Sequence, residues 1–250
     1  MRRESYLARA LKAVIVGAAL ICGVTTQAYA GQPPKLELSE QAVFTTDYMF
    51  RSVSNTNQNP AAQPEFDLKY GILNVGIFGS NTAYGEGIEI DYYAYITPSF
   101  RGIDFQIGGY EYTYPGSSDI DYFELNSGAS HAFDKLILGV NNWWSPNWAG
   151  LGTQSDAIEF TAEYDFAGKL WNFFSPKVTG KVGRQLYENE ELVPDYTYWD
   201  VGLKLAFLDR WEAEIRYYDT DYNKTGCAIN SGGRDNCDAR VVGAIKATFP

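Results

Sequence analysis

Residues 88–97 have the sequence Ile-Glu-Ile-Asp-Tyr-Tyr-Ala-Tyr-Ile-Thr, and this stretch decides the fold class. In an extended chain, neighbouring side chains point to opposite faces. One face therefore carries Ile88, Ile90, Tyr92, Ala94 and Ile96, and the other carries Glu89, Asp91, Tyr93, Tyr95 and Thr97. The same separation recurs in residues 158–165, 200–207 and 211–218. Such an alternation predicts β-strands with one apolar and one polar face.

The links between these stretches alternate strictly between tight turns and long polar loops. Tight turns lie at 70–71, 100–102, 133–135, 166–169 and 208–210, and long loops lie at 53–62, 80–87, 114–119, 145–155, 188–194 and 219–237. Membrane barrels have short turns on the periplasmic rim and long loops outside. The sequence therefore predicts an all-β protein, a transmembrane antiparallel up-and-down β-barrel of about 12 strands, with both chain ends on the periplasmic rim.

The first 30 residues have the features of a secretory signal peptide. Arg2, Arg3, Arg9 and Lys12 precede the apolar run 13–24, and Ala28-Tyr29-Ala30 offers a cleavage site. The apolar run is shorter than the roughly 18 residues of a bilayer-spanning helix. Residues 31–250 are expected to form the barrel. Removing the signal takes away four basic residues and Glu4, which shifts the formal charge from −11 to about −14 and excludes a nucleic-acid partner.

Alternation alone does not say which face of the barrel is apolar, because a soluble barrel has the same period. Aromatic residues, which make up 16% of the chain, favour an apolar face toward lipid. One group lies at the short-turn ends of strands: Phe100, Phe133, Phe166, Trp171, Phe207, Trp211 and Phe249. A second group lies near the long loops: Tyr112, Tyr114, Tyr122, Trp143, Trp144, Trp148, Tyr196, Trp199 and Tyr222. We interpret the two groups as the two interfacial belts of a membrane barrel.

The last strand supports the same orientation. Val241, Gly243, Ile245, Ala247 and Phe249 share one face, which resembles the C-terminal signal by which assembly machinery recognises outer-membrane barrels. In that signal the aromatic residue is usually terminal, whereas here Pro250 follows it. The predicted location is the bacterial outer membrane. The predicted partners are outer-membrane lipid, lipopolysaccharide and the barrel-assembly machinery.

Two cysteines, Cys227 and Cys237, lie ten positions apart in the longest loop of the predicted barrel. A secreted protein meets an oxidising compartment, so this pair predicts a disulfide. Closing so short a loop stabilises it by about 3 kcal/mol at most. Metal binding by the pair is disfavoured because no histidine lies nearby.

The polar faces of the strands predict the residues that line the lumen. The predicted pore-lining residues are Asp47, Arg51, Glu89, Asp91, Asp104, Glu159, Glu163, Asp200, Lys204, Glu212, Glu214, Arg216, Arg240 and Lys246; Glu65, Asp67, Asp165, Lys69, Lys177 and Lys181 share the same faces. Two interpretations stay open: the charges pair across strands, or the acidic excess forms a pore that prefers cations. With about 12 strands any pore is narrow, and loops folded inward would close it. Asp47 and Arg51, four apart, are predicted to form a structural pair inside the barrel.

Several segments resemble the TorF family of porin-like proteobacterial proteins. The densest similarity is Thr45-Thr46-Asp47-Tyr48-Met49-Phe50-Arg51, followed by 54–56, 60–63, 66–67, 76–81, 89–94, 112–116 and 122–125. The family usually has Gly and Gln where Ser52 and Asn55 stand here. The resemblance implies an outer-membrane channel and supplies no solute.

These observations predict a porin that lets small hydrophilic solutes or ions diffuse passively, with a preference for cations and without a cofactor or metal. One alternative is a non-conducting structural or adhesive barrel that acts through its loops. A phospholipase-type enzyme is the other. Some outer-membrane barrels carry a Ser-His-Asn site, but here the single histidine, His131, is followed ten residues later by Asn141 instead of a serine. An enzyme is therefore not expected.

Overall fold

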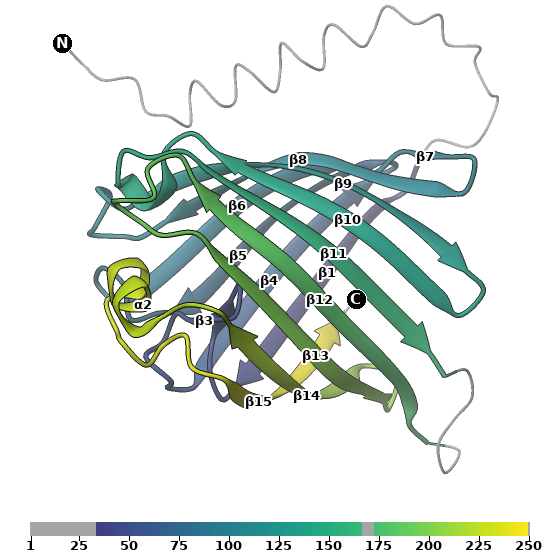
Figure 1. The fold of residues 1–250 in the computed structure, drawn as a ribbon. Helices are drawn as coiled ribbons and strands as arrows, with labels where there is room; N and C mark the ends of the chain where they lie inside the picture. The colour runs from purple at the N-terminus through teal and green to yellow at the C-terminus, as the bar shows by residue number, and fades with distance from the viewer. Residues whose placement is uncertain (1–33, 167–172, 250) are drawn as a thin grey trace, which may run out of the picture. The chain divides into compact units, whose positions relative to one another are not determined.

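The computed structural model describes residues 34–166 and 173–249, and within them twelve long strands close into an antiparallel barrel (Figure 1). Each strand pairs with its neighbours in sequence, β6 pairs with β8, and β1 pairs with β15 to close the sheet. The strands are β1 (Leu36–Thr45), β4 (Ala61–Tyr70), β5 (Leu73–Asn81), β6 (Ile88–Ile96), β8 (Ile103–Thr113), β9 (Tyr122–Phe133), β10 (Leu136–Ser145), β11 (Ser155–Asp165), β12 (Ser175–Tyr187), β13 (Tyr196–Phe207), β14 (Trp211–Thr220) and β15 (Arg240–Phe249). The predicted fold class is confirmed. The predicted signal peptide lies outside the described residues.

The apolar faces of the strands point outward, as predicted. Phe160 is 61% exposed; Ile158, on the same face of β11, and Ile215, on β14, are exposed too. The aromatic belt at the short-turn rim is also found: Phe100, Phe133, Phe166, Trp211 and Phe249 are exposed there, and Phe207 is half-buried. Trp171 lies outside the described residues. Apolar side chains on the outer face offer no hydrogen-bond partners. The backbone N–H and C=O groups of the wall therefore bond only to neighbouring strands, and closure of the barrel gives every long strand two neighbours.

The second aromatic belt is wrong. Tyr112, Tyr122, Trp148 and Tyr196 are buried in a cluster at the long-loop end of the barrel, together with Tyr114, Tyr187 and Tyr198. The reason is the parity of their positions along the strands, because side chains two apart share a face. Tyr122 is on the same face of β9 as the buried Glu124, whereas the exposed Leu125 is on the opposite face. Among the strand residues of that group, Trp144 and Trp199 keep the outward register.

The chain turns into the barrel after β1. Residues 46–60, called the inward loop below, include a hairpin of β2 (Met49–Phe50) and β3 (Val53–Ser54). The hairpin turns at Arg51 and Ser52, which both have positive φ angles (48° and 59°) and are almost fully buried. The sequence placed residues 53–62 in an outer loop, and the structure corrects this for residues 53–56, which are buried, whereas residues 57–60 are exposed. The inward loop packs against the buried aromatic cluster through Phe50 and Val53.

The loop after β14 contains a short helix, α2 (Lys224–Ser231), held by the predicted disulfide between Cys227 and Cys237. Asn223 caps the helix by accepting the Thr225 and Gly226 N–H groups, and Gly232 ends it in the left-handed conformation. A hydrogen bond from Lys224 to Asp235 (2.9 Å) lowers the pKa of the Asp235 carboxyl. In the described ranges, no helix is long and apolar enough to span a membrane.

The remaining short elements are β7 (Ser99–Phe100), which extends β8 at the short-turn rim, and the 3₁₀ helix η1 (Trp148–Gly150) in the loop after β10.

Candidate functional site

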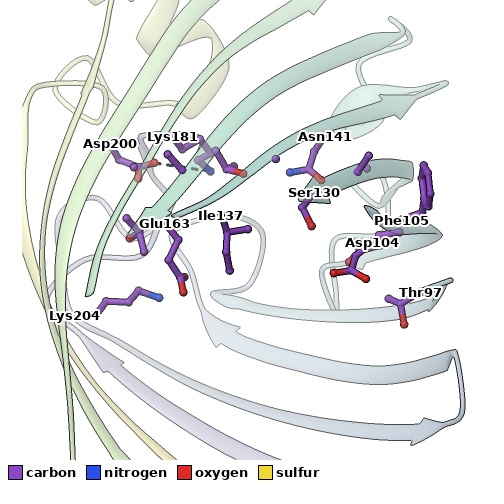
Figure 2. Close-up of a pocket in the computed structure, with 18 of the residues that line it drawn as sticks. Thr97, Asp104, Phe105, Ser130, Ile137, Asn141, Glu163, Lys181, Asp200 and Lys204 are labelled. Atoms are coloured by element: carbon purple, nitrogen blue, oxygen red, sulfur yellow. Dashed lines mark ion pairs between the residues drawn. The ribbon is translucent and has the colours of Figure 1, made fainter. Parts of the chain in front are cut away.

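The lumen contains a cavity of about 830 Å³ between the inward loop and the short-turn rim (Figure 2). Arg51 and Ser52 of the inward loop line one end, and Gly71 and Ser99 line it at the short-turn rim. Its side wall is made of small residues from β9, β10 and β12: Gly128, Ala129, Ser130, Gly139, Thr179 and Gly180. These small side chains leave the space that larger residues would fill.

Charged side chains stand on both sides of this cavity. Figure 2 shows Asp200 and Lys204 on one side and Asp104 across from them. The predicted lumen residues lie on the inner faces of their strands or in the inward loop. Asp104, Glu163, Asp200, Lys204 and Arg216 line the main cavity, Glu212 and Lys246 line a hollow at the short-turn rim, and Asp47, Asp91 and Glu214 line a third hollow beside the inward loop.

The charges on β11 to β15 pair across strands. Lys181 Nζ lies 3.1 Å from Glu159 Oε1, and Lys177 Nζ lies 2.8 Å from Glu163 Oε1. Further pairs across strands are Lys177 with Asp165, Lys181 and Arg216 with Asp200, and Lys204 and Lys246 with Glu212; Arg216 also pairs with Glu214 on its own strand. On this side the pairing interpretation matches the structure.

The acids that face the lumen from β4, β6 and β8 are different. No ion pair joins any of them to a basic side chain among the residues that the structure describes; they are Glu65, Asp67, Glu89, Asp91 and Asp104. Tyrosine hydroxyls donate to three of them instead: Tyr93 to Glu65 (2.6 Å) and Asp67 (2.7 Å), and Tyr48 to Glu89 (2.6 Å). The charge of the lumen is therefore segregated, with its unpaired acids gathered on one side.

Arg51 does not pair with Asp47, which corrects the sequence prediction. Its guanidinium lies 2.9 Å from Glu124 and donates to Gln185 (2.9 Å), with Phe50 stacked 4.7 Å away. The predicted pair fails because β1 ends at Thr45 and the chain reverses at Arg51, so the two residues share no strand. Glu124 is fully buried and was missed by the sequence prediction, although its register with Asn126 and Tyr122 marks it as inward-facing.

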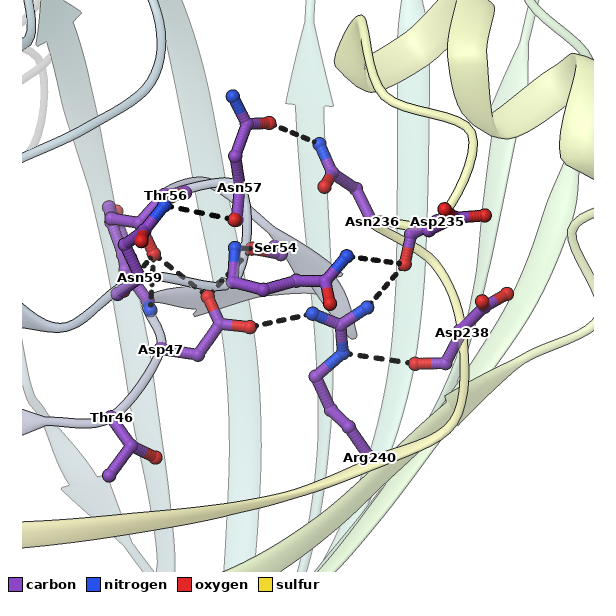
Figure 3. Close-up of polar contacts among 12 residues, drawn as sticks. Thr46, Asp47, Ser54, Thr56, Asn57, Asn59, Asp235, Asn236, Asp238 and Arg240 are labelled. Carbon is purple, nitrogen blue, oxygen red and sulfur yellow. Dashed lines mark hydrogen bonds and ion pairs between the residues drawn. The ribbon is translucent and has the colours of Figure 1, made fainter.

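Asp47 instead forms an ion pair with Arg240, which is the first residue of β15 (Figure 3). The Arg240 guanidinium lies 2.8 Å from Asp47 Oδ2, while Ser54 and Thr56 donate to Asp47 Oδ1 (2.6 and 2.8 Å). Arg240 also donates to the Asp235 and Asp238 carbonyl oxygens. These bonds, with Asn236 Nδ2 to Asn57 Oδ1 (2.8 Å), tie the inward loop to the disulfide-linked loop.

The family described as a bacterial protein of unknown function (Gcw_chp) matches residues 29–249. The chain belongs to the Gcw_chp family. A search of curated proteins finds no match to this Gcw_chp protein. Its fold is similar to that of the NanC porin, with a TM-score of 0.53 at 10% identity, over 86% of this chain and 100% of that chain.

Two further solved structures align with the Gcw_chp chain at lower scores. A porin gives a TM-score of 0.41 at 11% identity, over 86% of this chain and 100% of that chain. A loop L8 deletion mutant of OmpT, an outer membrane protein of Vibrio cholerae, gives 0.42 at 10% identity, over 87% and 100%. The likeness to the NanC porin shows a porin-like barrel.

Proposed function

We propose that this Gcw_chp protein is a channel of the bacterial outer membrane through which small hydrophilic solutes diffuse passively, with a preference for cations. One observation carries the proposal: a polar cavity of about 830 Å³ lies inside a closed barrel whose outer face is apolar. The resemblance to the TorF family agrees with it. In this proposal outer-membrane lipid and lipopolysaccharide surround the wall, and β15 is the strand that the barrel-assembly machinery recognises.

The cation preference follows from the unpaired acids. Charges on β11 to β15 are largely neutralised by their partners, so the field in the lumen is set by the five acids that face it from β4, β6 and β8, which outnumber Lys69, the basic residue of β4 that lines the main cavity. Acidic side chains lining a pore lower the energy of a cation there and raise that of an anion. The inward loop narrows the lumen, and we therefore expect small solutes only.

The placement of His131 argues against an outer-membrane hydrolase. Asn141, at the position of the nucleophilic serine in those enzymes, lines the main cavity. His131 follows the inward-facing Ser130, so it is on the opposite, outer face, where it contacts Phe133. His131 Nδ1 is also engaged with the Gly102 carbonyl oxygen at 2.7 Å. A nucleophile and its base must lie within hydrogen-bond reach of each other. The proposal therefore assigns no catalytic residue.

Single-channel recording tests the proposal. Residues 31–250 would be refolded, checked for a β-rich circular dichroism spectrum, and inserted into a planar bilayer with a KCl gradient. We expect steady openings and a reversal potential of the sign given by cation permeation. A folded barrel without openings would contradict the proposal and favour a structural or adhesive barrel; an anion-selective pore would contradict the cation preference alone.

A further inference from the structure

The third hollow described above is a cavity of about 360 Å³ between the inward loop and the wall of unpaired acids. The inward loop contributes Tyr48 and Phe50, and β6 contributes Asp91 and Tyr93. Glu65, Tyr110, Tyr112, Glu214 and Tyr218 complete much of the lining. Small-molecule sites have volumes upward of about 300 Å³, so the cavity has room for a small ligand.

Asp91 is the acid of this cavity that has no basic partner. The residue is only 5% exposed, and its carboxyl shares a hydrogen bond with the carboxyl of Glu89, the other acid of β6. No N–H or hydroxyl group of the described residues donates to Asp91 Oδ1. The other acids are engaged: Asp47 with Arg240, Glu214 with Arg216, and Glu65 with Tyr93 and Gln41. Two hydrogen-bonded carboxyls share one proton, so the Asp91–Glu89 pair keeps one buried negative charge. A buried charge without a basic partner is costly, and a bound cation removes that cost.

Aromatic rings line the same cavity as this carboxyl group. The rings of Tyr93 and Tyr110 stack with centroids 5.2 Å apart, and Tyr48, Phe50 and Tyr112 also line the cavity. Aromatic faces attract alkylated ammonium groups through their quadrupoles. Calcium, in contrast, takes about six to eight oxygen ligands, and the other three carboxyl groups of this lining are already bound to Arg240, Arg216 and Tyr93.

We propose that this cavity binds a small organic ammonium ion, with Asp91 as its counter-ion and Tyr93, Tyr110 and Tyr112 as its aromatic lining. The inference rests on the proposed function, because it names the class of solute that the channel holds on its way through. It extends that function from a general cation preference to a site with a defined chemistry.

Calorimetric titration of the refolded barrel in detergent micelles tests the site. The probes are choline chloride and 3,3-dimethylbutan-1-ol, a neutral molecule of nearly the same shape. We expect saturable binding of choline and none of the alcohol. Asp91→Asn is expected to weaken choline binding about tenfold or more, because it removes a desolvated counter-charge.

Two controls separate the site from general effects on the lumen. Asp104→Asn removes another unpaired acid, which lines the main cavity and not this one, and should leave choline affinity unchanged. Tyr110→Phe keeps the aromatic face and should bind choline normally, whereas Tyr110→Leu should weaken it about threefold to tenfold. The Tyr110 pair keeps the test decisive if Asp91→Asn does not fold.

The site is overturned if the folded barrel binds no choline, binds the alcohol equally well, or binds choline unchanged after Asp91→Asn and Tyr110→Leu. Single-channel recording from the same preparation tests the proposed channel function independently of choline binding. Steady conductance without choline binding removes the site and keeps the proposed function. Choline binding without conductance supports the site and overturns the channel.

Discussion

At the scale of single residues, the Arg51–Glu124 pair holds the inward loop inside the barrel. Both side chains are almost inaccessible to solvent (3% and 0% exposed), so each charge is stabilised by the opposite charge of its partner and not by water. Arg51→Ala leaves the Glu124 carboxylate buried without its partner, and losing one member of a buried pair costs about 3–5 kcal/mol. We expect the inward loop to loosen, with faster amide hydrogen exchange in residues 46–60 and a larger single-channel conductance.

Arg184→Ala is the matched control for that change. Arg184 is half exposed and lies 3.6 Å from both Asp195 and Asp221 among the long loops. Exposed ion pairs contribute at most about 1 kcal/mol, so exchange and conductance should stay near those of the unmodified protein. Equal behaviour of the two variants would show that burial of Arg51 does not hold the loop.

Sequence reasoning reached the inward-facing character of Arg51 and Asp47 but not their partners. Arg51 meets Glu124 across 73 positions and Asp47 meets Arg240 across 193 positions. A local spacing of four residues suggested a pair because both lie in one polar segment. The positive φ angles at Arg51 and Ser52 reverse the chain there, and no residue of this segment is a glycine that would have signalled the turn.

At the scale of elements, the period of the strands was predictable and gives a sharp test of orientation. Phe160, at the middle of β11, points outward, and its neighbour Thr161 lines the main cavity. Phe160→Arg puts a charge in the lipid at mid-depth, which costs about 2–4 kcal/mol. Thr161→Arg puts the same charge in the polar lumen and should fold nearly normally. Denaturant titration of folding into lipid vesicles measures both, and similar losses in the two variants would contradict the assigned faces.

The disulfide-linked loop gives a second test at this scale. Its residues 235–240 bind the inward loop, so opening the link between Cys227 and Cys237 should loosen both segments. A link closing so short a loop contributes about 3 kcal/mol. We expect reductant to speed limited proteolysis near α2, while the double variant Cys227→Ser, Cys237→Ser is cut rapidly with or without reductant. Cleavage that does not respond to reductant in the unmodified barrel would count against this role.

The alternation that predicted the strands also explains where the prediction failed. Counting aromatic residues near the loops suggested a lipid-facing belt, but parity places Tyr112 and Tyr122 on the same face as the buried acids. The strands are specified by local periodicity, which a sequence displays directly. The filling of the lumen depends on which non-neighbouring strands face each other across it, and this follows only from closure of the barrel.

At the scale of the whole molecule, the segregation of charge in the lumen predicts which acids control ion selectivity. Glu163 is paired with Lys177, so replacing both by Gln leaves the net charge of the lumen unchanged. Asp67→Asn with Asp104→Asn removes two charges that no ion pair joins to a basic residue in the described part of the chain. We expect the first double variant to keep the reversal potential of the unmodified channel and the second to move it toward zero.

Salt concentration decides whether that shift is electrostatic. The screening length is about 10 Å at 0.1 M salt and about 3 Å at 1 M, so unpaired acids act across the lumen only in the dilute solution. The difference between the Asp67→Asn, Asp104→Asn channel and the unmodified channel should therefore be large at 0.1 M KCl and small at 1 M. A difference of equal size at both concentrations points instead to a change in the shape of the lumen, and then the acids of β4 and β8 do not set the selectivity through their charge.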